Sequence, residues 1–236
     1  MVFVSRTAIN GAIFAAVMLV HANAWEAGAE SIRLDLELPG TARSFVRLWT
    51  VGENTQTAGL ATDPAGRIFT TVSKDVRALA PDGSEFWTFD CSALGGCNTV
   101  STNFDAVFAG LSSVGVARVS NVSGAVECVY QPGDLGMTLT PQRLLATDSY
   151  VVIGSTNPQS VVVVAAATCT ELFRIESPNG EPVGSVVADE ANNNLVVSWD
   201  AAGSGSPEII SYRLDNGGEL CRYSREELFR TLLING

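Results

Sequence analysis

Beyond its first 24 residues, this 236-residue chain lacks the residue types on which much enzyme chemistry depends. Its single histidine, His21, lies within those 24 residues, and one lysine, Lys74, remains after them. Without histidine there is no Ser-His-Asp triad, no Cys-His pair, no imidazole base and no histidine-ligated zinc. Lys74 follows no glycine-rich loop, so the sequence has no phosphate-binding P-loop either.

Charged residues are scarce, and most of them are acidic. They make up 17% of the chain, with 25 Asp and Glu against 14 Lys and Arg, for a net charge of −11. This excess of negative charge repels phosphate backbones and anionic lipid headgroups, so we expect no nucleic-acid partner. Hydrophobic residues reach 46%, which is enough for a packed core and excludes a disordered chain.

Residues 1–24 have the pattern of a secretory signal peptide. Arg6 precedes an apolar run over residues 12–20, and Ala22-Asn23-Ala24 forms a small-residue cleavage site. The run is shorter than the roughly 20 apolar residues that span a bilayer, so an uncleaved membrane anchor is the weaker alternative. We expect a secreted or extracytoplasmic chain of residues 25–236 with no stable membrane span.

All five cysteines follow the predicted leader. Cys91 and Cys97 frame a five-residue loop that contains two glycines, and we predict a disulfide between them. Cys128, Cys169 and Cys221 are an odd remainder, so at least one of them is free or bonded to another chain. A second bridge and small buried thiols are equal alternatives for this remainder. No pair has the spacing of a zinc site, and we expect no metal.

Short β-branched runs recur along the chain with a period of roughly 40 to 50 residues. The runs are 68–72, 107–111, 151–155 and 195–199. An aspartate precedes each run, at Asp63, Asp105, Asp148 and Asp189. A later strand-like piece in each unit opens with glutamate, at Glu85, Glu127, Glu171 and Glu219. Two independent landmarks therefore share one period.

This period, with several strands in each unit, predicts an all-β fold: a β-propeller of about four to five recognisable four-stranded blades. The predicted repeat units are 50–89, 90–130, 131–175 and 176–223. A large β-sandwich is the alternative, but it does not predict the shared period. A capping box at residues 224–227 and an apolar face after it predict a short C-terminal helix over 224–236.

The number of units leaves open whether the ring is complete. Residues 31–38 alternate strictly between polar and apolar, as in a half-exposed strand. This strand could close the ring by pairing with the last blade, or it could belong to a blade that is missing. The chain is then an unusually small ring or a truncated, open part of a larger propeller. An open arc leaves sheet edges unpaired and allows self-association.

One unit resembles a known family. Residues 78–87, Ala-Leu-Ala-Pro-Asp-Gly-Ser-Glu-Phe-Trp, are similar to the tryptophan-docking repeat of quinoprotein, or pyrroloquinoline quinone-like, β-propellers. In that family a tryptophan after the glycine turn wedges between blades, which implies this role for Trp87 and, from the similar Arg47-Leu48-Trp49, for Trp49. Val129, Phe173 and Cys221 stand in place of the tryptophan in the later units.

The resemblance also implies an alternative function, that of a quinone-dependent oxidoreductase with pyrroloquinoline quinone and calcium. The vicinal cysteine pair that stacks on the cofactor in the best-known branch is absent, and no motif places the aspartate base. We therefore expect a chain without enzyme activity or cofactor, because fold does not imply function. The expected role is a scaffold that binds a protein or glycan through its loop faces. The one glycosylation sequon, Asn121-Val122-Ser123, falls in a predicted turn.

Overall fold

The structure is a computed structural model that describes residues 57–72, 74–112, 114–132, 141–200 and 207–223, with the backbone of four short strands before them. These strands are β1 (Thr7–Ile9), β2 (Ala12–Phe14), β3 (Ala16–Met18) and β4 (Leu34–Leu36). They belong to a separate compact unit made of Met1–Gln56 and Pro81–Ser84. β4 lies within the predicted strand 31–38, but it pairs with β3 and not with the last sheet.

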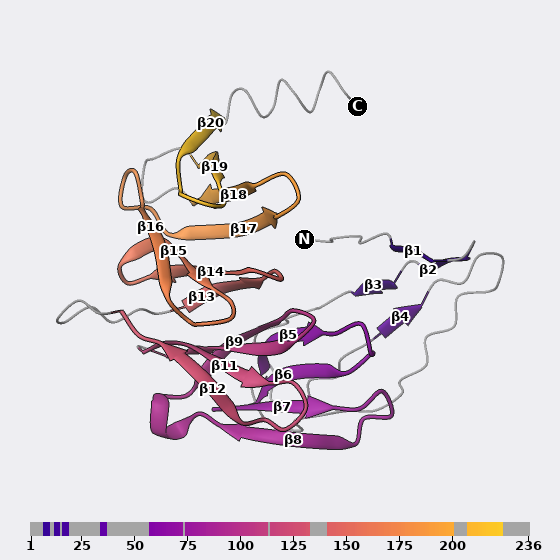
Figure 1. Cartoon of the computed structure of the whole chain (residues 1–236). Helices are drawn as coiled ribbons and strands as arrows, with labels where there is room; N and C mark the ends of the chain where they lie inside the picture. The colour runs from indigo at the N-terminus through magenta and orange to yellow at the C-terminus, as the bar shows by residue number, and fades with distance from the viewer. Residues whose placement is uncertain are drawn as a thin grey trace, which may run out of the picture. The chain divides into compact units, whose positions relative to one another are not determined.

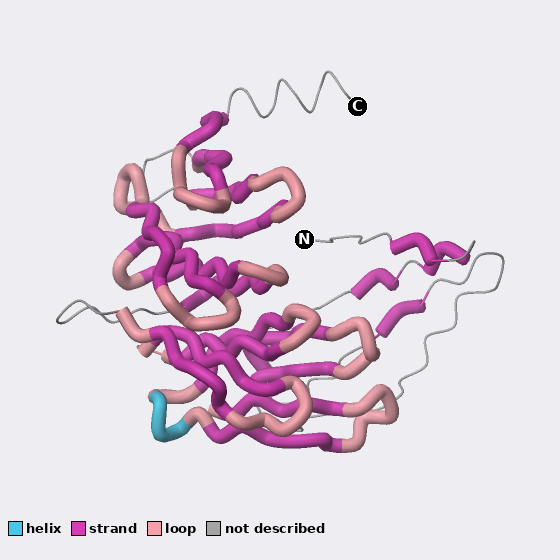
Figure 2. The backbone as a smooth tube through the Cα atoms, in the orientation of Figure 1, coloured by secondary structure: helices cyan, strands magenta, loops and turns pink. Residues whose placement is uncertain are grey.

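The rest of the described chain folds into four antiparallel sheets of four strands each (Figures 1 and 2). Sheet 1 comprises β5 (Thr57–Thr62), β6 (Ile68–Val72), β7 (Asp75–Leu79) and β8 (Glu85–Asp90). Sheet 2 comprises β9 (Cys97–Thr102), β10 (Ala106–Leu111), β11 (Gly115–Ser120) and β12 (Val126–Tyr130). Sheet 3 comprises β13 (Pro141–Ala146), β14 (Tyr150–Thr156), β15 (Gln159–Ala165) and β16 (Glu171–Glu176). Sheet 4 comprises β17 (Val183–Asp189), β18 (Asn194–Trp199), β19 (Glu208–Arg213) and β20 (Glu219–Tyr223).

Each sheet is a simple meander in which consecutive strands pair. Because direction alternates, the turn after the first strand and the turn after the third strand lie at the same end of a sheet, which we call the turn end. Short turns rich in Asp, Asn and Gly make this geometry possible. In the first of them, the backbone N–H and the guanidinium of Arg67 donate to the carboxylate of Asp63, at 2.9 and 2.6 Å.

The sheets stack face to face through their apolar sides. The first strands β5, β9, β13 and β17 contact one another in chain order, and three buried clusters fill the spaces between sheets 1 and 2, 2 and 3, and 3 and 4. All six residues of β10 and the run Val161–Val164 in β15 are buried. Neighbours on both faces thus explain the continuous apolar runs of the middle strands.

The four stacked sheets confirm the all-β class and the propeller-like repeat. In the part of the chain that the structure describes, sheet 4 does not pack on sheet 1, so no closed ring is seen. The predicted helix over 224–236 and the predicted wedge Trp49 lie outside the described residues. Over those described ranges, no helix is long and apolar enough to cross a membrane.

Candidate functional site

A bulge at the start of every fourth strand fixes the position at which one sheet docks on the next. The register shifts by one residue, at Phe86, Glu127, Leu172 and Leu220. The residue after each bulge, which we call the docking residue, is Trp87, Cys128, Phe173 and Cys221 in turn. The prediction of Val129 in the second unit is therefore wrong, because Glu127 occupies the bulge and moves Cys128 into the docking position.

Trp87 packs in the buried cluster between sheets 1 and 2. Its buried indole Nε1 donates to the backbone carbonyl of Asn121 at 3.2 Å, and its ring lies 5.8 Å from that of Phe69. Gly124, in the turn between β11 and β12, faces the indole so closely that a Cβ there would be 2.9 Å from Cδ2. Arg67 of sheet 1 also donates to the Asn121 carbonyl, at 2.8 Å. The junction therefore combines packing with two hydrogen bonds.

The second junction is covalent. Cys128 forms a disulfide with Cys169, which lies in the turn between β15 and β16 of the next sheet. Cys169 has a φ of 54°, and its backbone N–H donates to the carbonyl of Ala165, the last residue of β15. Gly124 and Gly217 make the same hydrogen bond in their turns, to the carbonyls of Ser120 and Arg213. Cys169 thus stands where the neighbouring sheets carry a glycine, and a disulfide replaces the aromatic wedge.

The third junction uses an aromatic ring again. Phe173 lies against Gly217, where an added Cβ would be 2.7 Å from the ring carbon Cδ2. Gly217 has a φ of 73°, a left-handed conformation that a glycine adopts without strain. In each of sheets 1 to 3, the docking residue therefore meets one left-handed turn residue of the next sheet, and the three docking side chains differ.

Charged groups reinforce the second junction. Tyr130 of β12 donates its hydroxyl proton to the carboxylate of Glu171 in β16, and Arg174 contacts both, at 3.3 Å from the Tyr130 oxygen and 3.0 Å from Glu171. Burial raises the pKa of the Tyr130 phenol, and the hydrogen bond to Glu171 raises it further. This network holds sheet 2 to sheet 3 beside the disulfide, so we read it as structural.

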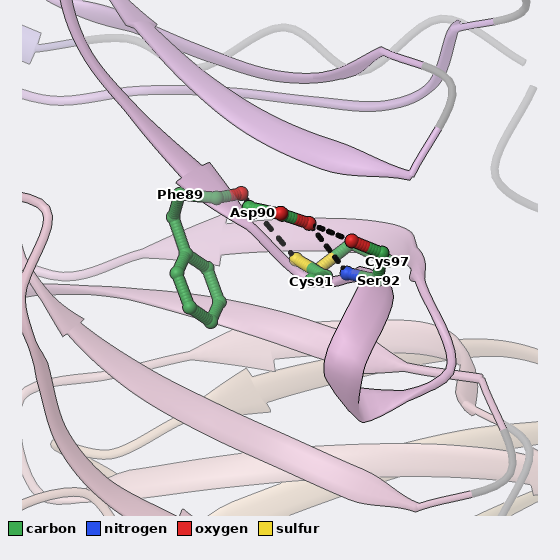
Figure 3. Close-up of a disulfide and its surroundings, with 5 residues drawn as sticks. All are labelled: Phe89, Asp90, Cys91, Ser92 and Cys97. Atoms are coloured by element: carbon green, nitrogen blue, oxygen red, sulfur yellow. Dashed lines mark hydrogen bonds between the residues drawn. A yellow bond between two sulfur atoms is a disulfide. The ribbon is translucent and has the colours of Figure 1, made fainter.

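The predicted Cys91–Cys97 pair is joined by a disulfide in the connection between sheets 1 and 2 (Figure 3). The connection contains the short 3-10 helix η1 (Ser92–Leu94). Before it, the backbone N–H and hydroxyl of Ser92 donate to the Asp90 carboxylate, and these bonds lower the pKa of Asp90. Both sulfur-bearing residues are buried, so the disulfide holds the connection in place and offers no reactive group.

Asn121 is engaged in the fold. The residue is 8% exposed, and its side-chain Nδ2 donates to the backbone carbonyl of Phe104 at 3.0 Å. Nδ2 is the atom to which a glycan would be attached. A glycan at this position would break the hydrogen bond and enter a buried space, so the folded arrangement argues against the predicted glycosylation.

Most of the exposed large apolar side chains among the described residues lie at the turn ends of the sheets; Val187 and Tyr223 of sheet 4 do not. Phe104, between β9 and β10, is 72% exposed, and Val122, between β11 and β12, is 65% exposed. The Asn121 amide links these two turns of sheet 2. The bulge residues Phe86, Leu172 and Leu220 are also exposed at this end. The sequence assigned binding to the loop faces as a whole and did not single out these exposed apolar residues.

The described residues do not fit a quinone and calcium site. Across residues 57–72, 74–112, 114–132, 141–200 and 207–223, no group of three or more His, Cys, Asp or Glu side chains could hold a metal ion. The acidic turn at Asp189 is satisfied internally, since Asn192 donates to its carboxylate through its backbone and side-chain amides. The two disulfides join cysteines with sequence separations of 6 and 41, so neither is a vicinal pair.

Comparison with known proteins places the chain in the class of β-propeller folds. No protein-family model and no curated protein matches it. Among solved structures, quinohemoprotein alcohol dehydrogenase from Comamonas testosteroni matches 71% of this chain and 35% of its own length, at 16% identity and a TM-score of 0.53. BamB from Moraxella catarrhalis matches 94% of this chain and 76% of its own, at 13% identity and a TM-score of 0.55.

Raptor from Chaetomium thermophilum also matches, over 91% of this chain and 20% of its own length, at 13% identity and a TM-score of 0.68. The chain therefore spans about a third of the matched alcohol dehydrogenase and about a fifth of Raptor. The structural likeness includes proteins of the quinoprotein type. At sequence identities of 13 to 16%, it shows a shared fold and nothing about function. The two disulfides indicate that the chain folds in an oxidising compartment.

Proposed function

We propose that the chain is an exported, non-catalytic scaffold that binds a protein partner through the turn end of sheet 2. The observation that carries this proposal is the pair Phe104 and Val122, two large apolar side chains exposed on adjacent, mutually hydrogen-bonded turns. Aromatic side chains on rigid loops supply much of the energy of protein interfaces. Apolar groups without converging polar groups favour a protein surface over a glycan.

Site-specific photo-cross-linking tests the proposal. A benzophenone amino acid placed at Phe104 or Val122, in protein exported by the source cells, should yield a discrete cross-linked adduct at both positions. Leu172 is the matched control, because it is 47% exposed at the turn end of a different sheet. No adduct at residues 104 and 122, or the same adducts at residue 172, would overturn the proposal.

A second measurement addresses the non-catalytic part. The purified chain is incubated with pyrroloquinoline quinone and Ca²⁺, and its melting temperature and visible absorbance are recorded. We expect neither to change, because the described carboxylates are dispersed or satisfied within their own turns. A saturable shift would show that the chain binds the cofactor and would contradict this part of the proposal.

A further inference from the structure

One face of sheet 4 is equivalent to the faces that sheets 1, 2 and 3 use to pack on the following sheet. Sheets 1, 2 and 3 each bury the face that carries the docking residue against the following sheet. The register places the same face of sheet 4 on the side away from sheet 3, and no described sheet covers it. We call it the outer face of sheet 4. The side chains at its centre are those of Ser185, Val187, Val196, Ser198, Ile209, Ser211, Cys221 and Tyr223.

The composition of the outer face suits contact with a protein of the same kind. Val187 is 47% exposed and Tyr223 43% exposed, whereas the residues at the corresponding positions of sheet 3 are the partly buried Leu145 and the buried Ile175. Its charged side chains are one acid and one base, Asp189 and Arg213, at one end. The whole chain carries a net charge of −11, so two copies repel each other over most of their surface. A neutral face is where they can meet with least repulsion.

The docking residue of this face is the exposed, free thiol of Cys221. In sheet 2 the same position is Cys128, whose sulfur reaches the adjoining sheet and forms a disulfide there. In a head-to-tail copy, sheet 1 would present the turn Pro81–Ser84, which has Gly83 in place of Cys169. A copy related by a two-fold axis instead presents Cys221 itself, because residues near such an axis meet their own equivalents.

We propose that a second copy of this chain docks on the outer face of sheet 4 and that the two Cys221 residues form an intermolecular disulfide. The oxidant is a glutathione-type disulfide. One Cys221 thiolate attacks it, forms a mixed disulfide and releases one thiol; the thiolate of the second copy then attacks the Cys221 sulfur and releases the other. Each Cys221 thiol loses one proton, and the two electrons reduce the glutathione disulfide to two thiols.

The test is the oligomeric state of the purified chain in a glutathione redox buffer. Non-reducing electrophoresis and light scattering should give a species of about twice the 24.8 kDa of one chain, which reductant converts to monomer. Cys221→Ser should abolish the covalent dimer. Peptide mapping should find Cys221 linked to Cys221, with both internal disulfides retained. A monomer that keeps one titratable thiol per chain overturns the proposal.

A matched pair of variants separates docking from random collision of thiols. Val187→Arg places a charge on the outer face, and Leu172→Arg places one at an equally exposed site on sheet 3. Val187→Arg should slow the covalent dimerisation by about tenfold or more, and Leu172→Arg should leave it unchanged. Equal rates for both variants refute docking through this face. A monomer whose Cys221 resists alkylation refutes it too.

Discussion

Gly124 and Trp87 form a contact whose energy can be separated from backbone strain by one matched variant. Gly124 has a φ of +73° and lies against the indole, whereas Gly180 has a φ of +68° and would place a Cβ no closer than 3.5 Å to Gln159. Gly180→Ala therefore carries the strain of a left-handed alanine alone, about 1 kcal/mol. Gly124→Ala carries this strain and also displaces the indole, for a total of about 2 to 4 kcal/mol.

Trp87→Ala removes the same contact from the other side. The loss of a buried tryptophan and of its hydrogen bond to Asn121 should lower the free energy of unfolding by about 4 kcal/mol. Gly124→Ala in the Trp87→Ala background should then cost only about 1 kcal/mol, as Gly180→Ala does. The double-mutant cycle should therefore give a coupling of about 1 to 3 kcal/mol.

Urea unfolding followed by circular dichroism measures the cycle without relying on tryptophan fluorescence, which Trp87→Ala itself changes. The four free energies come from the wild type, the two single variants and the double variant, with Gly180→Ala as a fifth. A coupling below about 0.5 kcal/mol, the limit of additivity for independent sites, would refute a wedge at this junction. The wedge would also be refuted if Gly180→Ala and Gly124→Ala, each in the wild-type background, lowered the free energy of unfolding by the same amount.

Three further outcomes follow from the junctions. Cys128→Ala with Cys169→Ala should lower the free energy of unfolding by about 4 kcal/mol in urea, because the disulfide closes a loop with a separation of 41 residues; no loss would contradict this. Ser92→Ala should lower the urea midpoint more at pH 6 than at pH 2, because the stabilisation from the lowered folded pKa of Asp90 is complete above the unfolded value of about 4 and is lost as the pH falls through the folded pKa. Tyr130 should stay protonated in an absorbance titration above pH 10 until the chain unfolds, since burial raises its pKa.

The repeat could be predicted from sequence because its signals are local. Each turn needs Asp, Asn or Gly, and each buried middle strand needs β-branched residues, so the period is visible in composition alone. The Cys91–Cys97 pairing needed only the five residues between the two cysteines. Trp87 was found because its unit keeps the complete docking pattern of a known repeat.

What sequence reasoning missed depends on register. A bulge at Glu127 moves the strand by one residue, and composition gives no sign of it, so the sequence predicts Val129 at the docking position in place of Cys128. The Cys128–Cys169 pairing follows only when Cys128 is aligned with Trp87 and Cys169 with Gly124. The exposed pair Phe104 and Val122 was missed because an apolar residue in a turn looks in sequence like part of the core.

The docking side chain differs from one junction to the next, yet the sheets stack in the same way at each. This is possible because each junction involves only two neighbouring sheets. In a stack of sheets, each sheet contacts only the sheets beside it, so stability is approximately a sum of local terms. An indole, a disulfide or a phenyl ring can each supply such a term against a left-handed turn residue. The side chain can therefore change from one junction to the next, provided that the bulge and the left-handed turn residue stay in place. That is why the period of this chain is clear while the docking pattern itself is intact in a single described unit.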